Sequence, residues 1–285
     1  MLAVGLALCS AVLFGALSVA LALAMRRDPD AEVGALVTGI VALAVCAPFL
    51  LARWDWNGDV LPFLLAGLLA PGGSQVLYVR AVREAGPSRA AVIVGAAPLV
   101  SVTIALVALG EPVRPALIAG AVLIVAGGLA LAGERGRPAG FRAIGLALGL
   151  GAAAFFATRD NVVRKLAEDS SVSPELAAAA TILSGSALIA VYLVATRGAR
   201  LPRQLSRALV PFAPSGLLWG LSYVSLFEAF YRSRVSVVSP LVASESLFGV
   251  LAAWLLFRRH EHVGRRVLLG AVLVVGGGTL IGAFR

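Results

Sequence analysis

Long stretches of apolar residues, separated by short polar segments, occupy nearly the whole chain. A helix needs about 20 mostly apolar residues to cross the hydrocarbon layer of a membrane, whereas transmembrane strands are shorter and alternate in polarity. The pattern therefore predicts an all-α membrane protein with ten transmembrane helices. The predicted spans are residues 2–24, 32–52, 60–82, 88–108, 115–133, 141–163, 174–196, 208–230, 235–257 and 266–284.

The polar segments between these runs contain residues that end helices or hold them at the membrane surface. Gly86-Pro87-Ser88 and Gly110-Glu111-Pro112 favour turns, because proline cannot continue a helix. Trp54 and Trp56 follow the second run, and tryptophan gathers at the membrane interface. These residues support the predicted limits of the spans.

Two glycine-rich stretches indicate an internal repeat. Gly120–Gly128 (GAVLIVAGG) in the fifth span matches Gly270–Gly278 (GAVLVVGGG) in the tenth. Gly5–Leu8 in the first span likewise matches Gly145–Leu148 in the sixth. Because both matches relate spans at the same position in each half, the chain is expected to contain two related units.

The two predicted units are residues 1–136 and 140–285, with five spans in each. Five is an odd number, so the second unit must enter the membrane with the opposite orientation. The expected architecture is therefore two inverted five-helix repeats, with a site near the midplane of the membrane between them. Small residues such as Gly145 and Gly149 allow the close helix approach that this architecture needs.

The composition agrees with a membrane protein and argues against other classes. Hydrophobic residues make up 60% of the chain and charged residues only 14%, compared with about 25% charged residues in soluble domains. The formal net charge of +9 comes from arginines in short clusters between apolar runs, so a nucleic-acid partner is not expected. Cys9 and Cys46 lie singly in apolar runs, and His260 and His262 share one loop, so no cofactor or metal site is expected.

Short motifs near the end of each half add a family resemblance. In the first half they are Tyr78-x-x-Ala81, Ala97-Pro98, Leu109-Gly110-Glu111 and Gly120–Gly128. In the second half they are Ala229, Ser239-Pro240-Leu241, Glu245-Ser246, Glu261 and Gly270–Gly278. In order and spacing these motifs resemble the EamA-type transporters of the drug/metabolite transporter superfamily over nearly the whole chain.

The chain departs from the usual family pattern at two places in its second half. The family usually has Glu-Pro where this chain has Glu245-Ser246, and Leu-Gly-Glu where it has Arg259-His260-Glu261. These departures leave the resemblance to the family intact, but they do not indicate a particular subfamily.

The resemblance implies a secondary transporter that exports or exchanges a small metabolite, amino acid or drug by alternating access. The expected setting is a bacterial cytoplasmic membrane, and the expected partners are a small-molecule substrate, the lipid bilayer and a coupling proton. The alternatives are a helical membrane enzyme and a membrane assembly or adaptor protein. No HExxH, G-x-S-x-G or nucleotide-binding loop is present, so an enzyme and direct ATP coupling are not expected.

Ionisable residues inside the spans are the first candidates for a substrate site, because each costs about 2.5–3.5 kcal/mol at the centre of a membrane helix. Glu245 lies deepest and could exchange a proton or bind a polar substrate; the alternative is a structural hydrogen bond between helices. Arg159 could hold an anionic group, while Asp160 accepts an amine or balances the arginine, with Asn161 beside them. The alternative is that this cluster lies at the interface, beyond the true helix end.

Further candidates lie on the third and eighth spans. Glu228 has serines one and two turns back on the same helix face, which makes a polar stripe. The remaining candidates combine an apolar body with a polar tip or amide and suit a small amphipathic molecule: Gln75, Tyr78, Trp219 and Tyr223. Glu111 and Glu261 are instead interpreted as structural acids at helix ends.

The charge distribution and the family resemblance give opposite orientations. The odd-numbered connections contain 16 of the 24 lysines and arginines, which places these connections in the cytoplasm and the termini outside. The family more often suggests cytoplasmic termini. Both orientations stay open from the sequence.

Overall fold

The computed structural model describes residues 1–52, 59–85, 90, 93–94, 97–112, 114–132, 144–256 and 265–284. The secondary structure of this part of the chain is all helical, with no strand. In chain order its elements are α1 (Leu2–Arg27), α2 (Ala31–Ala52), α3 (Val60–Gly67), η1 (Leu68–Gly73), α4 (Ser74–Ala85), α6 (Ala97–Ala108), α7 (Pro115–Ala132), α8 (Ile144–Asp169), α9 (Pro174–Arg197), η2 (Gly198–Arg200), α10 (Leu201–Arg232), α11 (Val235–Val242), α12 (Glu245–Leu256) and α13 (Arg265–Phe284).

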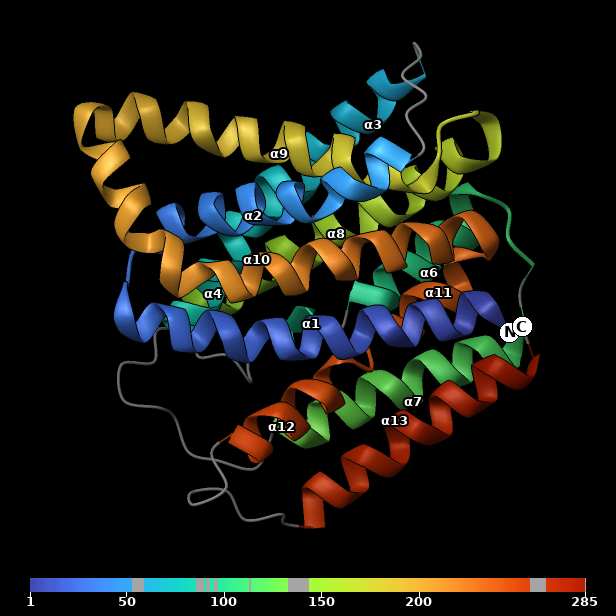
Figure 1. Cartoon of the computed structure of the whole chain (residues 1–285). Helices are drawn as coiled ribbons and strands as arrows, with labels where there is room; N and C mark the ends of the chain where they lie inside the picture. Colours follow the sequence, from blue (N-terminus) through green and yellow to red (C-terminus); the bar gives the residue numbers. More distant parts are fainter. Residues whose placement is uncertain are drawn as a thin grey trace.

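The helices run back and forth between two ends of the molecule. Both chain termini lie beside each other at one end, and the α1–α2 connection and η2 lie at the other end (Figure 1). Four described stretches are long and apolar enough to cross a bilayer: Leu2–Arg27, Ala31–Leu51, Val60–Ala85 and Pro174–Arg232. The shorter apolar helices are Leu99–Ala108, Pro115–Ala130, Val235–Gly249 and Val272–Ile281.

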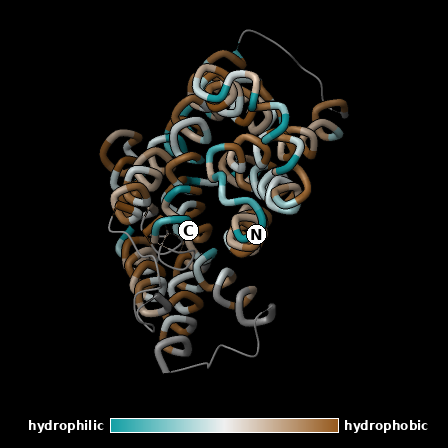
Figure 2. The backbone as a smooth tube through the Cα atoms, turned by 90° about the vertical axis from the view of Figure 1, so that its left-hand side faces the viewer, coloured by the Kyte–Doolittle hydropathy of each residue, from teal (hydrophilic) through white to brown (hydrophobic). Residues whose placement is uncertain are grey.

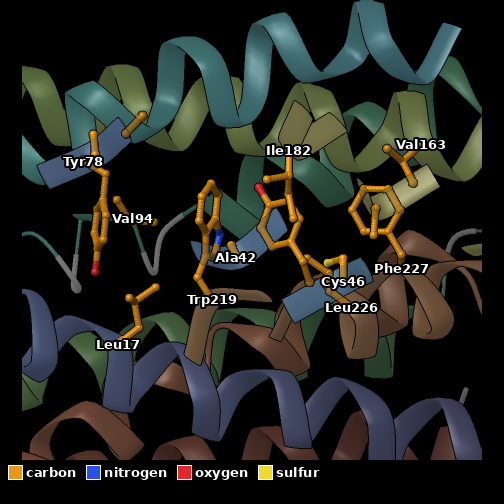
Figure 3. Packing of buried hydrophobic residues seen from close by; sticks show 14 of the residues in the cluster. Leu17, Ala42, Cys46, Tyr78, Val94, Val163, Ile182, Trp219, Leu226 and Phe227 are labelled. Carbon is orange, nitrogen blue, oxygen red and sulfur yellow. The ribbon is translucent and has the colours of Figure 1, made fainter. Parts of the chain in front are cut away.

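The outer surface of the helices is apolar as well as the interior. Large side chains such as Leu51, Val107 and Val210 are exposed, and hydrophobic positions follow the helices around their circumference (Figure 2). Inside, a cluster that includes Leu17, Tyr78 and other buried side chains fills the space between helices distant in sequence (Figure 3). An apolar exterior suits contact with lipid, so the chain is a multi-pass integral membrane protein.

The expected all-helical class is confirmed, while the number of ten spans stays a prediction. Each predicted span overlaps a described helix, but much of the first part of the fourth span, residues 88–96, lies outside the described residues. The predicted unit boundary at 136–140 and the acid Glu261 also lie outside them.

Two spans that were expected to be continuous are interrupted near their middle. In the third span, Ala70 has non-helical dihedral angles (φ −143°, ψ 116°) within η1, directly before Pro71 and two glycines. Proline removes a helical hydrogen bond and clashes with the preceding turn. The ninth span is divided into α11 and α12 by a turn at Ala243–Ser244. Backbone hydrogen bonds there span three residues instead of four, as in the bond from Ser244 N–H to Leu241 C=O.

Two other spans are longer than expected. The sixth was predicted to end at residue 163, but α8 continues to Asp169. The eighth was predicted to begin at residue 208, but α10 begins at Leu201, because buried Leu201, Ala208 and Phe212 share one helix face. Hydropathy alone misses these extensions, since the added turns also contain charged residues.

Many contacts between the two halves of the chain occur in pairs. In each pair, a helix of the first half packs against one of the second half, and the corresponding helices with the halves swapped also pack together. Helix α1 packs against α10 and α12, while α8 packs against α4 and α6. Helix α2 packs against α10, while α9 packs against α3 and η1. The remaining large contacts, α2 with α9 and α7 with α13, each join corresponding helices. This arrangement fits the two-repeat architecture predicted from the sequence.

The glycine-rich stretches that indicated the repeat pack against each other at the α7–α13 crossing. A Cβ atom added at Gly127 would lie 2.7 Å from the carbonyl oxygen of Gly270, and one at Gly120 would lie 2.8 Å from that of Gly277. Only glycine permits this backbone approach, as in other close membrane helix pairs.

Candidate functional site

A cavity of about 60 Å³ lies where helices from both halves of the chain meet. A single water molecule needs at least about 10–15 Å³ on this scale, so the space holds a few water molecules or part of a small solute. We call it the central cavity; it is lined by Phe14, Leu17, Gln75, Tyr78, Val94, Ala97, Phe156, Arg159, Asp160, Leu226, Ser239, Val242, Ala243 and Glu245.

The central cavity lies halfway along the helices that form it. Phe14 and Leu17 are in the middle of α1, and Phe156 and Arg159 are in the middle of α8. The other walls come from the two interrupted spans, because Gln75 follows η1 and Glu245 follows the α11–α12 turn. Sites at broken helices near the membrane midplane are typical of secondary transporters.

Arg159 and Asp160 are neighbours on α8 and form an ion pair inside the protein. Arg159 is 2% exposed, and its Nε lies 3.0 Å from Asp160 Oδ1. Its guanidinium carbon lies 4.9 Å from the ring centre of Tyr223, 5.7 Å from that of Phe227 and 5.8 Å from that of Phe156. Cation–π attraction is strongest for a desolvated cation. The rings and the carboxylate therefore hold the charge in place.

The continuation of α8 decides between the two interpretations of this polar cluster. Arg159, Asp160 and Asn161 are all buried, and the helix extends well past them to Asp169. The alternative of an exposed interfacial cluster at the helix end is wrong.

Glu245 is a second carboxyl group on the central cavity. It is the first residue of α12, where the helix dipole favours negative charge. It forms no hydrogen bond or ion pair with any of the described residues. Asp160, in contrast, accepts a hydrogen bond from Ser239 Oγ at 3.4 Å in addition to its ion pair. Of these two acids, Glu245 is thus the one whose carboxylate oxygens have no partner among the described residues.

Unused donors also line the central cavity. Among the described residues, Arg159 Nη1 and Gln75 Nε2 have no hydrogen-bond partner, and Gln75 is only 1% exposed. Buried polar groups without partners are costly and usually mark a bound ligand or water. The cavity therefore offers donors and acceptors to a polar molecule.

The structure brings five of the nine predicted site residues to the central cavity: Gln75, Tyr78, Arg159, Asp160 and Glu245. Tyr223 lies behind them against Arg159, and Trp219 packs edge-on against Tyr223 with ring centres 5.0 Å apart. These two aromatic residues support Arg159 without lining the cavity.

The other two predicted residues lie away from the central cavity. The Asn161 amide donates to the backbone oxygens of Ser101 and Ala157 at 3.0 and 2.9 Å, and so joins α8 to α6. Glu228 accepts from Arg232 Nε at 2.7 Å, one turn along α10. The Asn161 Nδ2 group and the Glu228 carboxylate thus have structural partners.

Several lining residues were not among the predicted site residues. Ala97 and Ser239 are small residues that each precede a proline, Pro98 and Pro240. Ala97 begins α6 as Glu245 begins α12, and this correspondence between the halves could have identified Ala97. Phe14 and Phe156 lie in uniformly apolar runs, where no sequence signal separates cavity from lipid.

Glu111, a partly buried acid, has structural partners. Glu111 accepts from the backbone N–H groups of Val235 and Ser236 at 2.9 and 3.1 Å, which caps the start of α11. The prediction that Glu111 is a structural acid is confirmed.

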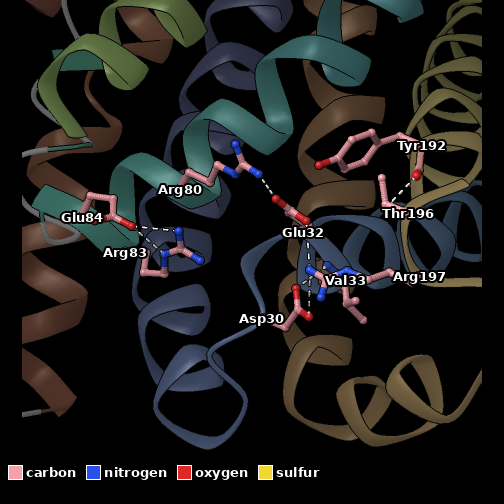
Figure 4. Close-up of polar contacts among 9 residues, drawn as sticks. All are labelled: Asp30, Glu32, Val33, Arg80, Arg83, Glu84, Tyr192, Thr196 and Arg197. Carbon is pink, nitrogen blue, oxygen red and sulfur yellow. Dashed lines mark hydrogen bonds and ion pairs between the residues drawn. The ribbon is translucent and has the colours of Figure 1, made fainter. Parts of the chain in front are cut away.

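A second group of charges, the ionic cluster, consists of Asp30, Glu32 and Arg197 at helix ends and Arg80 within α4 (Figure 4). Glu32 pairs with Arg80 of α4 and, at 3.0 Å, with Arg197 at the end of α9. Asp30 also pairs with Arg197, at 3.4 Å, and accepts from the backbone N–H of Val33. The cluster ties α2, α4 and α9 together.

Two comparisons with known proteins find matches. The model of the family described as "EamA-like transporter family" matches residues 1–132 and 143–283, almost the full length of the chain. The chain belongs to the EamA-like transporter family. A solved structure described only as "Crystal structure of protein" superposes with a TM-score of 0.74 at 20% sequence identity, covering 98% of this chain and 95% of that one. At this identity the likeness shows the fold alone. Curated protein sequences give no match.

The EamA-like family is a family of membrane transporters, so the chain is a membrane transporter. The family match falls into two segments of similar length, which fits the two-repeat architecture. A transporter has a small-molecule substrate and works in a lipid bilayer. Among the described residues, no group of three or more His, Cys, Asp or Glu side chains could hold a metal ion.

Proposed function

We propose that this EamA-like protein is a secondary transporter that exports a small organic solute across the cytoplasmic membrane by alternating access. The observation that carries the proposal is the central cavity, which combines Arg159, Asp160 and Glu245 halfway along the helices. Buried charge at that depth is costly and is kept for function.

The helix arrangement supports alternating access. The contacts of α1 with α10 and α12 of the second half have counterparts in the contacts of α8 with α4 and α6 of the first half. Inverted five-helix repeats, here residues 1–136 and 140–285, would produce this exchange and would allow the cavity to open to either side in turn. The repeat relation would make the two states similar in energy.

The charges of the central cavity suit a solute that carries both an anionic and a cationic group. Arg159 Nη1 has no hydrogen-bond partner among the described residues and could bind an anionic oxygen. The planar guanidinium recognises carboxylate geometry well. Asp160 and Glu245 can accept an ammonium group, and Tyr78 and Phe156, whose ring centres lie 6.5 Å apart, offer an apolar surface. Metabolites, amino acids and amphipathic drugs include such molecules.

Glu245 is our candidate for proton coupling. Its carboxyl group has no partner among the described residues, so its charge can change without breaking an ion pair. A proton on Glu245 and a cationic group of the solute would compete for the same oxygens. Such competition is the simplest physical basis for exchange of a solute against a proton.

Flux measurement tests the proposal. Purified protein in liposomes loaded with a mixture of small metabolites should release a few of them when a pH gradient is applied, as detected by mass spectrometry. Protein-free liposomes and a protonophore are the controls. Chemical conversion of a metabolite without flux would identify a membrane enzyme instead and would contradict the proposal.

A further inference from the structure

A second, larger hollow lies outside the central cavity. It has a volume of about 440 Å³ and is lined by residues of α1, of α13 and of the α11–α12 region. Its walls include Val4 and Leu8 of α1, Leu247 and Phe248 of α12, and Val275 of α13. We call this hollow the lateral crevice.

The lateral crevice is apolar and opens to the outside of the helix bundle. Val275 on its wall is 59% exposed, and Val272 one turn earlier is 61% exposed. One of its hydroxyl groups, that of Thr279, already donates to the Val275 carbonyl at 2.8 Å. Apolar cavities of this kind exclude water, so hydrocarbon is the natural occupant between membrane-spanning helices.

The crevice extends along α1 as far as Met1. Both chain termini lie at that end of the bundle (Figure 1). A lipid chain in the crevice can therefore run along the helices while its head group remains at the membrane surface. A free apolar solute would have no such anchor, which favours a membrane lipid as the occupant.

We propose that the lateral crevice binds one acyl chain of a membrane phospholipid, which packs against the turn that carries Glu245. Leu241 and Ser244 line the crevice, while Val242, Ala243 and Glu245 line the central cavity. The α11–α12 turn is thus a thin wall between the two spaces. A chain in the crevice supports this wall from the lipid side.

Two glycines of α13 provide a matched test. An added Cβ at Gly278, on the crevice wall, would meet only Leu241 Cδ2 at 3.7 Å, while one at Gly276 would meet nothing within 4 Å. Gly278→Leu therefore fills the crevice without a backbone clash. Gly276→Leu makes the same change of residue on the same helix and leaves the crevice open.

The measurement is phospholipid retained by the full-length protein after purification in mild detergent, determined by native mass spectrometry with added phosphatidylglycerol. Displacing two methylene groups of a bound chain lowers the affinity by more than about tenfold. We expect the wild type and Gly276→Leu to retain one lipid and to gain thermal stability from it. Gly278→Leu should lose both effects.

A second pair of variants fills the crevice from the opposite wall. Val4→Phe narrows it from α1, and Leu2→Phe is the control, because Leu2 is exposed and does not line the crevice. Val4→Phe should behave like Gly278→Leu, so a folding defect in either variant alone cannot produce the result. Equal lipid retention by Gly278→Leu and Gly276→Leu would overturn the proposal and would leave the transport proposal untouched.

Discussion

The ionic cluster and the central cavity are both built from acidic residues and arginines, but they satisfy these charges differently. In the ionic cluster, Glu32 is shared by two arginines, and Asp30 bonds both to Arg197 and to the start of its own helix. In the central cavity, Asp160 is paired with Arg159, but Glu245 has no partner among the described residues.

The difference separates structural charges from binding charges. The ionic cluster lies at helix ends, where acids at the start of α2 and Arg197 at the end of α9 also complement the helix dipoles. The central cavity lies halfway along the helices, where an unsatisfied charge costs far more. A buried charged group without a partner usually marks the place of a bound ligand or water. The variants below test this distinction, from the largest expected effect to the smallest.

Arg159→Gln should have the largest effect. It leaves Asp160 without its ion pair in a buried position, and losing one partner of a buried pair costs about 3–5 kcal/mol. Both thermal stability and flux should fall. Arg159→Lys is the matched variant: it keeps the charge and much of the stability, but loses flux because lysine lacks the planar fork. A normal melting temperature and normal flux in Arg159→Gln would contradict the assignment.

Gln75→Leu should separate binding from folding. Leucine has a similar size but offers no donor to the solute, so KM for flux should rise about 5–10-fold, the effect of losing one hydrogen bond. The melting temperature should stay constant or rise, because a buried amide nitrogen without a partner among the described residues is removed. A fall in stability without a change in KM would show that Gln75 is structural.

Glu32→Gln should produce the opposite result. Two ion pairs are weakened at a partly buried position, which should cost about 1–2 kcal/mol and lower the melting temperature by a few degrees. The difference from the wild type should shrink in 1 M salt, where the Debye length is only about 3 Å. The flux per folded molecule should stay close to that of the wild type; loss of flux at unchanged stability would mean that the ionic cluster belongs to the transport site.

Glu228→Gln should have the smallest effect. Its ion pair with Arg232 spans one helical turn, and such pairs contribute only about 0.3–0.5 kcal/mol. Flux and its pH dependence should be unchanged, because Glu228 does not line the central cavity. A flux defect in reconstituted Glu228→Gln would place this acid on the transport path.

The sequence predicts the charges of the site better than its shape. The cost of ionisable groups in a membrane identifies Arg159, Asp160 and Glu245, and all three line the central cavity. Successive positions on a helix point about 100° apart, so hydropathy cannot tell that Asn161 and Glu228 face other partners. Neighbouring helices decide that, through the contacts of Ser101 and Arg232.

The same limit applies to the fold. The apolar runs locate the helices, and the glycine stretches at 120–128 and 270–278 relate the halves and pack together in α7 and α13. The interruptions at Ala70 and at Ala243–Ser244 were missed, because an apolar run reads the same whether its helix is continuous or broken. These interruptions are what place Gln75 and Glu245 at the cavity.

The most direct test of the account compares two acids within the spans, Glu245 in the central cavity and Glu228 outside it. Glu245→Gln and Glu228→Gln should be reconstituted at equal density, and flux of a transported solute should be measured across a range of pH. The account predicts that Glu245→Gln lowers flux about 10–100-fold and removes its pH dependence, with a normal melting temperature, while Glu228→Gln matches the wild type. Normal flux with normal pH dependence in Glu245→Gln would contradict the account.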